Sequence, residues 1–198
     1  LAVCKDLAAH AAQEREYLAE DENGCVQFTE DIYTELSRTG SGYEALTEEY
    51  PFLWTSIGRQ KPVQLSYYWS YTGITGMYFP FLAECNVNIE QPDLSIPFTA
   101  SHESAHSRGI AFENECNFLA YLSCINSEYP EFRYSGYMNA FKFCSNSLYA
   151  CDKSCDMCHV NHEISTHFLR NFSKCREVNS SGVSGCSCKN ELRSASQS

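Results

Sequence analysis

One segment of the chain, residues 97–127, reads PFTASHESAHSRGIAFENECNFLAYLSCINS. The proline and threonine near its start suit the first turn of a helix, whereas Arg108 followed by Gly109 suits the end of one. After this break, apolar residues recur again at helical spacing. The segment therefore predicts two consecutive helices, at about residues 98–108 and 112–126.

The first of these helices carries the motif H-E-x-x-H, formed by His102, Glu103 and His106. Because each helical residue turns by about 100°, the two histidines lie about 40° apart on one face and can bind one metal ion. Glu103 can then deprotonate a metal-bound water, as in helix-borne zinc peptidases. The alternative is a surface helix with two solvated histidines.

A catalytic zinc ion needs a third protein ligand, and acidic residues begin the second helix. Glu113 and Asn117 are four residues apart and share a face, whereas Glu115 points about 160° away from Glu113. An asparagine in this position can hold a ligand histidine through its second ring nitrogen. We therefore predict Zn²⁺ ligands His102, His106 and Glu113, with Asn117 as support and Glu115 as the alternative ligand. The alternative for Glu113 is that it binds no metal and that its negative charge stabilises the N-terminus of the second helix.

The rest of the chain alternates between helical and extended patterns. Spacing of apolar residues predicts further helices at about residues 1–20, 29–36, 43–50, 135–149 and 156–172, with the run SRTGSG as a break after the second. Tyrosine, threonine, valine and isoleucine predict a small sheet at about residues 63–88. The expected fold is α+β and predominantly helical, with the H-E-x-x-H helix beside the sheet. We expect one domain over residues 1–178 and a Ser- and Gly-rich tail over 179–198, which its two cysteines can pin.

Charge and hydropathy restrict the classes of partner. The 198 residues include 14 Lys and Arg against 25 Asp and Glu, which gives a net charge of -11. Such a chain is not expected to bind nucleic acid or an anionic membrane surface. Its apolar stretches fall short of the roughly 20 residues that a membrane span needs, so we expect no membrane contact from this chain itself.

The chain has twelve cysteines, and this even number favours an oxidising compartment, so we expect an extracytoplasmic or secreted protein. The run CDKSCDMCH could form a structural zinc site from Cys151, Cys155, Cys158 and His159, although disulfides are the favoured interpretation. The chain begins without a signal segment, which we interpret as processing or excision.

Three blocks carry a resemblance to a known family: SYTGITGMYFPFLAECNVN at 70–88, the segment 97–127, and RYSGYMNA at 133–140. They resemble a bacterial family of zinc peptidase-like proteins, common in Firmicutes and classed as a domain of unknown function. The similarity extends more weakly over residues 1–149. H-E-x-x-H followed by E-x-x-x-N also resembles the gluzincins, the zinc peptidases with a glutamate ligand. This resemblance implies a zincin-like active-site helix and, again, Glu113 as the third ligand.

Two departures from the family pattern limit what the resemblance implies. Cys85 and Cys116 stand where such families usually have a small residue, and the cysteine-rich C-terminal quarter matches poorly. Members of the family generally have membrane-spanning segments before this region, which implies that an N-terminal anchor can be missing from this chain.

In zinc peptidases an extended strand usually lies beside the active helix and pairs with the substrate backbone. The stretch YTGITGMY, residues 71–78, is the candidate strand, and its substrate-binding residues would be Gly73, Ile74, Thr75 and Gly76. The alternative is a buried core strand with glycine at a bulge.

A tetrahedral intermediate also needs an electrophile near its oxyanion. By analogy with the downstream tyrosine of many gluzincins, Tyr134 or Tyr137 could take this catalytic role, although packing is the alternative for each. The sequence as a whole predicts a zinc-dependent peptidase that acts on a peptide or protein substrate, with Glu103 as general base. The alternative is a disulfide-stabilised binding module on a peptidase-like scaffold, with a vestigial or structural zinc site.

Overall fold

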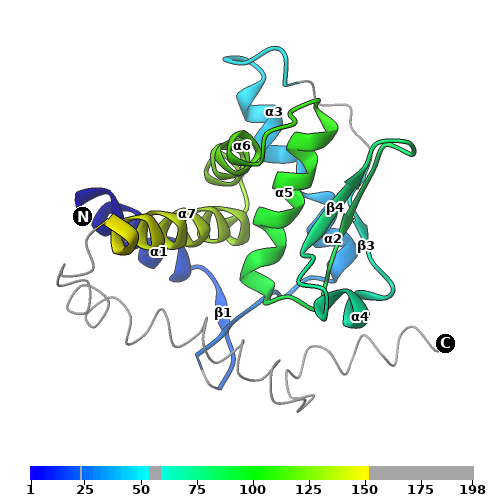
Figure 1. Ribbon diagram of the computed structural model, residues 1–198. Coiled ribbons are helices and arrows are strands. Elements are labelled where there is room, and N and C mark those ends of the chain that lie inside the picture. The colour runs from blue at the N-terminus through cyan, green and yellow to red at the C-terminus, as the bar shows by residue number, and fades with distance from the viewer. Residues whose placement is uncertain (23, 54–58, 152–198) are drawn as a thin grey trace.

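The computed structural model describes residues 1–22, 24–53 and 59–151 (Figure 1). Several predictions therefore fall outside the described residues. These are the helix at 156–172, the tail at 179–198, and the cysteine cluster with Cys155, Cys158 and His159.

The described chain is mostly helical and includes two small sheets, so the predicted α+β class is confirmed. The helices are α1 (Ala2–Arg15), α2 (Ile32–Ser37), α3 (Gly40–Leu46), α4 (Ser66–Ser70), the 3-10 turn η1 (Asp93–Ser95), α5 (Ile96–Ser107), α6 (Glu113–Ile125) and α7 (Pro130–Cys151). The strands are β1 (Ala19–Glu20), β2 (Val26–Gln27), β3 (Lys61–Pro62), β4 (Gly76–Phe79) and β5 (Glu84–Val87).

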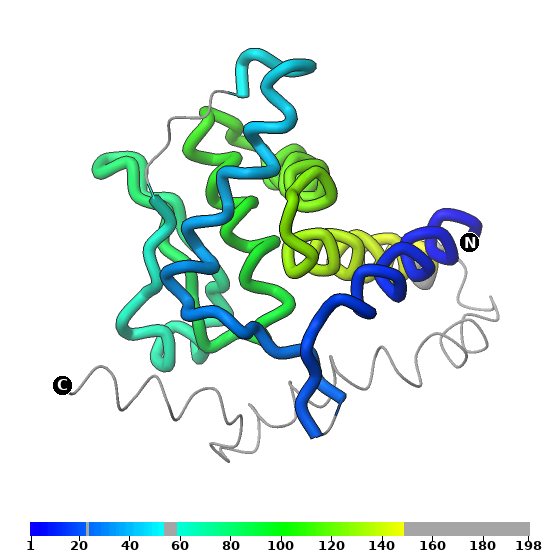
Figure 2. Tube along the Cα trace, turned by 180° about the vertical axis from the view of Figure 1, so that it is seen from behind, coloured from blue at the N-terminus to red at the C-terminus, as the bar shows by residue number. Residues whose placement is uncertain are grey.

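Helix α5 lies at the centre of the molecule. Figure 1 shows α6 and α7 on one side of it and the β4–β5 hairpin on the other. From behind, the segment with α2 and α3 covers α5 and α6, and α1 lies along α7 (Figure 2). Because it is enclosed in this way, α5 buries most of its residues, including polar ones such as Ser101 and Glu103. The helix that carries the H-E-x-x-H motif is therefore a core element, which removes the surface-helix alternative.

The larger sheet has the strand order β3-β5-β4, so β4 forms one of its edges. Strand β4 pairs antiparallel with β5, and Gly76 lies opposite Val87. The N–H of Asn88 donates to the carbonyl of Thr75 at 2.9 Å. Because hydrogen-bonded positions alternate along such a pair, the main-chain groups of Gly76 and Tyr78 face away from β5. The predicted strand beside the active helix thus exists, and it has an edge that β5 does not occupy.

Several element boundaries differ from the predictions. Residues 66–70, predicted as extended, form α4, and α1 ends at Arg15 because the chain then turns into β1. Helix α7 begins at Pro130, since proline suits a first helical turn. The run SRTGSG, predicted as a break, begins α3. There, an added Cβ at Gly42 would lie 1.8 Å from the carbonyl oxygen of Ser123, so glycine permits a close contact between α3 and α6.

Six cysteines of the described part have free thiols, whereas the run CDKSCDMCH, for which disulfides were favoured, lies almost entirely outside the described residues. No disulfide forms among Cys4, Cys25, Cys85, Cys116, Cys124 and Cys144. Within the same part of the chain, no helix is both long and apolar enough to span a membrane.

Candidate metal centre

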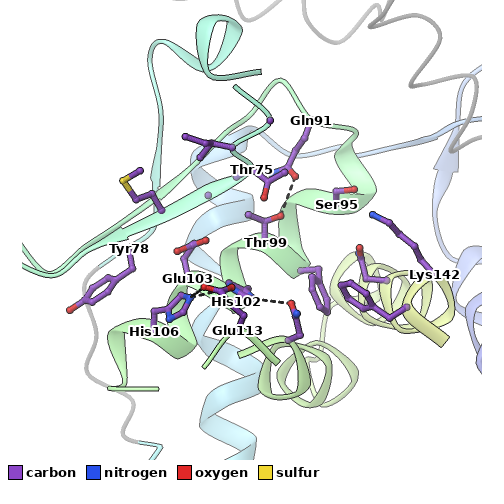
Figure 3. A pocket seen from close by; sticks show the side chains of 18 of the residues that line it. Thr75, Tyr78, Gln91, Ser95, Thr99, His102, Glu103, His106, Glu113 and Lys142 are labelled. Atoms are coloured by element: carbon purple, nitrogen blue, oxygen red, sulfur yellow. Dashed lines mark hydrogen bonds and ion pairs between the residues drawn. The ribbon is translucent and has the colours of Figure 1, made fainter. Parts of the chain in front are cut away.

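The two motif histidines face each other across one turn of α5. Their Nε2 atoms lie 3.1 Å apart, and both rings are largely buried (Figure 3). Burial, and then the neighbouring His106, lowers the pKa of His102 from its ordinary value. Both effects favour the neutral ring, which is the form that binds metal.

The second nitrogen of each ring is held by an oxygen acceptor. His102 Nδ1 lies 2.9 Å from the Oδ1 atom of Asn117, and His106 Nδ1 lies 2.9 Å from the carbonyl oxygen of Ile110. A carbonyl oxygen can only accept, so the Nδ1 atom of His106 carries the hydrogen, and the Asn117 oxygen selects the same tautomer in His102. In its neutral form, each ring therefore points an Nε2 lone pair toward the other ring.

Glu113 completes the set of converging atoms. Its carboxylate oxygens lie 3.1 Å from His102 Nε2 and 3.4 Å from His106 Nε2. In a tetrahedral zinc site with bond lengths of about 2.0–2.1 Å, ligand atoms are about 3.3 Å apart. The three distances are 3.1, 3.1 and 3.4 Å, with Glu113 Oε2 against His102 and Oε1 against His106, so these residues offer donor atoms at the spacing of a zinc site.

Cys116 is a further possible ligand near the histidines. The ligand atoms of His102, His106 and Cys116 lie within 4.8 Å of one another. However, the Cys116 sulfur lies 3.3 Å from His106 Nδ1, the nitrogen that already donates to Ile110. Burial also raises the pKa of the Cys116 thiol to about 12, which disfavours the thiolate that binds metal. The geometry thus favours Glu113, although its side chain is 76% exposed.

Glu103 lies between the candidate metal ligands and β4. Its residue is 6% exposed, and burial raises the pKa of its carboxyl group to about 7, while His106 and the backbone of Tyr78 act in the opposite direction. An added Cβ at Gly76 would lie 2.5 Å from a carboxylate oxygen of Glu103. The absence of a side chain at Gly76 therefore allows β4 to approach the carboxylate.

A cleft of about 690 Å³ opens onto these residues (Figure 3). Strand β4 and the residues before it form one wall, α5 forms the floor, and α6 and α7 form the other wall. All four predicted substrate-binding residues, Gly73, Ile74, Thr75 and Gly76, line it. The cleft thus places a strand edge beside the three candidate metal ligands.

Three of the other candidates lie away from the cleft lining. Tyr134 is fully buried in a core cluster with Ala11 and Met138, and the ring of Tyr137 stacks on that of His10. Glu115 is exposed and does not line the cleft, as its predicted direction implies. The packing alternative therefore describes both tyrosines, and neither is placed to contact an oxyanion at the cleft.

Cys85 and Cys116, the two departures from the family pattern, both contact the motif helix. The thiol of Cys85 donates to the backbone carbonyl of Glu103 at 3.3 Å, and Cys116 contacts His106 as described above. Both cysteines are fully buried. They fill space behind the motif and do not line the cleft.

The sequence interpretation missed the cleft residues that come from η1 and α7. Ser95, Asn139 and Lys142 line the end of the cleft nearest the start of α5. No motif spacing connects α7 to H-E-x-x-H, so only the packing of α7 against α5 and η1 identifies them.

Comparison with known proteins gives a family but no activity. A family model with the description "Protein of unknown function (DUF3810)" matches residues 1–194. The chain belongs to this family. The DUF3810 match extends well beyond residue 149, at which the resemblance was expected to end, and it includes most of the C-terminal quarter that was expected to match poorly. No curated protein and no solved structure matches the chain.

Proposed function

We propose that this protein is a zinc-dependent peptidase. The observation that carries the proposal is the convergence of two histidine Nε2 lone pairs and a carboxylate at mutual distances of 3.1 to 3.4 Å. Lone pairs and a negative charge repel one another at this separation, and a bound cation would remove that repulsion. The types of donor atom, their spacing and the cleft beside them support a catalytic role for the cation.

When bound by His102, His106 and Glu113, zinc would supply Lewis acidity, which lowers the pKa of a coordinated water toward about 7 and polarises a carbonyl group. Glu103 is placed to accept a proton at its carboxylate and later to return it to the leaving amine. Its raised pKa of about 7 suits both steps, because neither protonation state is strongly favoured near neutral pH. Asn117 and the Ile110 carbonyl keep the histidine rings oriented.

Strand β4 supports a peptide as the substrate. The main-chain groups of Gly76 and Tyr78 face away from β5, and an extended peptide can pair with such an edge. The backbone N–H of Tyr78 bonds to the Glu103 carboxylate, which leaves the Gly76 amide and the two carbonyl groups for the substrate. A peptide bond held there would lie between the general base and the metal ligands.

The binding-module alternative gains no support from the described residues. It was motivated by the cysteine-rich tail, which lies outside the described residues, and by Cys85 and Cys116, which are free thiols. The candidate site also has three protein ligands and lies beside a cleft. Catalytic zinc sites have three protein ligands and an open position, whereas structural sites have four protein ligands.

Metal content tests the proposal first. Wild-type protein and a His102→Ala, His106→Ala double variant are dialysed against a weak chelator, and zinc is measured by mass spectrometry. We expect about one zinc per chain in the wild type and none in the double variant. Equal zinc content in both proteins would show that the zinc binds at other residues.

Activity is then measured with a library of quenched fluorescent peptides and a hydroxamate inhibitor. We expect zinc-dependent cleavage that the hydroxamate blocks. A protein that keeps its zinc, cleaves no peptide and does not bind the hydroxamate would refute the peptidase function.

A further inference from the structure

The two ends of the cleft differ in chemistry. At one end, beside His106, the lining comes from Tyr78 and Pro80. The other end, near the start of α5, has the polar side chains of Ser95, Gln91, Asn139 and Lys142 beside the rings of Phe98 and Phe143. The difference matters because a peptide in the cleft would have its two sides in different surroundings.

The polar end includes one lysine side chain. Lys142 is the one lysine or arginine among the described residues that line the cleft, and the acidic lining residues, Glu103 and Glu113, belong to the metal centre. Figure 3 shows the Lys142 side chain reaching from α7 toward Ser95. An ammonium group at this place would attract a carboxylate of the bound peptide.

The start of α5 adds to this field. Ser95 is the N-cap residue, but its hydroxyl makes no capping hydrogen bond and lines the cleft instead. The N-terminus of a helix carries a partial positive charge. Its amides are already engaged, for example that of Phe98 with the Ser135 hydroxyl at 3.1 Å, so a ligand would contact the Ser95 hydroxyl and the Lys142 ammonium rather than the amides.

The direction of β4 determines which side of a peptide reaches this end. The Gln91 side chain forms hydrogen bonds with the Thr75 carbonyl and with the Thr99 hydroxyl. The backbone N–H of Tyr78 donates to the Glu103 carboxylate, one turn further along α5. Strand β4 and α5 therefore run in the same direction, away from Ser95. Antiparallel pairing is the more stable and more frequent arrangement. A peptide antiparallel to β4 has its C-terminal side at Ser95 and Lys142.

The distance along α5 indicates which residue is recognised. Ser95 precedes His102 by seven residues, which corresponds to about 10 Å along the helix axis. An extended peptide advances by about 3.3 Å per residue. The polar end therefore lies near the second or third residue after the cleaved bond.

We propose that Lys142 and Ser95 form a carboxylate-binding subsite that selects peptides with a negative charge at the second or third residue after the cleaved bond. This inference rests on the proposed peptidase function. The carboxylate can belong to an Asp or Glu side chain or to the C-terminus of the peptide. In the second case the enzyme releases di- or tripeptides from substrate C-termini.

Matched peptides separate the two sources. In the first pair, the charged peptide has Glu at the second and third residues after the cleaved bond and the neutral peptide has Gln there. In the second pair, the chain ends at the same distance, with a free C-terminus in the charged peptide and an amidated one in the neutral peptide. The wild type should cleave the charged member of one pair with about tenfold higher kcat/KM. The pair that shows the preference identifies the source of the carboxylate.

The decisive variants are Lys142→Met and Ser95→Ala. Lys142→Met should remove the preference while cleavage of the neutral peptides continues, and Ser95→Ala should reduce it. Lys61→Met is the matched control, because Lys61 pairs with Glu84 and does not line the cleft. No preference in the wild type, or a preference that persists in Lys142→Met, would overturn the subsite.

A separate measurement distinguishes failure of the subsite from failure of the peptidase function. Binding of the same peptides to the zinc-loaded Glu103→Gln variant is measured by calorimetry, without any need for turnover. Tighter binding of a charged peptide that Lys142→Met abolishes supports the subsite even if no peptide is cleaved. Equal binding of charged and neutral peptides refutes it, whether or not the wild type is a peptidase.

Discussion

His102 and His106 place their Nε2 atoms 3.1 Å apart while the Nδ1 atom of each ring is bonded to an oxygen acceptor. A neutral imidazole carries one N–H, and in each of these rings it is on Nδ1. Neither Nε2 atom then has a hydrogen to donate to the other ring. The arrangement is therefore poised for a shared cation, and Glu113 lies against it from the next helix. This relationship makes the site testable one residue at a time.

The general base is tested by Glu103→Gln. The variant should retain zinc, because Glu103 is not among the converging ligands, and turnover should fall roughly 10²- to 10⁴-fold because the proton acceptor is lost. Zinc content and peptide hydrolysis are measured side by side. Glu115→Gln, an exposed glutamate near the site, is the control and should change neither. Undiminished turnover in Glu103→Gln would remove this residue from the mechanism.

The third ligand is tested by alanine variants of Glu113, Glu115 and Cys116. Glu113→Ala should lower zinc occupancy because the carboxylate 3.1 Å from His102 is lost. Glu115→Ala and Cys116→Ala should keep the ion. Occupancy is measured by mass spectrometry after dialysis against graded chelator concentrations. Loss of zinc in Cys116→Ala alone would assign the ligand to the thiol.

The support of His102 is tested by Asn117→Ala. Loss of the 2.9 Å contact frees the His102 ring to rotate, so zinc affinity should fall about 10- to 100-fold. Asn117→Asp restores an oxygen acceptor and should recover most of the affinity. Competition with a fluorescent zinc chelator gives the affinities. Equal affinity in wild type and Asn117→Ala would show that the hydrogen bond does not orient the ring.

The close approach of β4 to α5 is tested by Gly76→Ala. The new Cβ would lie 2.5 Å from a Glu103 oxygen and 2.8 Å from the Thr99 methyl carbon, so the carboxylate or the strand must move. Turnover should fall roughly 10- to 100-fold while zinc remains bound. Gly40→Ala serves as the matched control, because its Cβ would meet nothing within 4 Å. Wild-type kinetics in Gly76→Ala would mean that the position of Glu103 is not critical.

Stability should depend on pH through Glu35, which does not line the cleft. Burial, and then the charge of Glu131, raises the pKa of the Glu35 carboxyl from 4.5 to about 7, although Arg38 opposes the shift. The folded protein then binds more protons than the unfolded chain between these values. Folding stability therefore decreases as the pH rises from about 4.5 to 7, by on the order of 3 kcal/mol.

Urea unfolding at pH 5 and pH 8 measures this effect. Glu35→Gln should flatten the decrease, since an amide carries no charge at either pH. Glu44→Gln, on an exposed site of α3, should leave the pH profile unchanged. Parallel profiles for wild type and Glu35→Gln would contradict the raised pKa.

Local spacing explains which parts of the site could be predicted. His102 and His106 share a face because they are four residues apart in one helix, and the same rule separates Glu113 from Glu115. The pairing of Asn117 with His102 followed from the contact between α5 and α6. These inferences needed only the helical period and a short connection between two helices.

Long-range packing explains what the sequence did not predict. The contact of Gly76 with Glu103 and the place of Lys142 depend on how β4 and α7 lie against α5, and no local pattern encodes that. Tyr134 shows the reverse case. It stands in a block with family resemblance, yet its side chain fills the core beside Met138. Residue type alone could not separate these two roles for a tyrosine.

The edge of β4 also bears on the behaviour of the protein at high concentration. Unpaired strand edges tend to recruit further copies of the same chain and to start aggregates. Here the strand has only four residues, and Pro80, which follows it, has no N–H to donate. The N–H of Tyr78 already donates to the Glu103 carboxylate. So short an edge can hold a peptide within a cleft, but it offers too few donors to extend a sheet from one copy to the next.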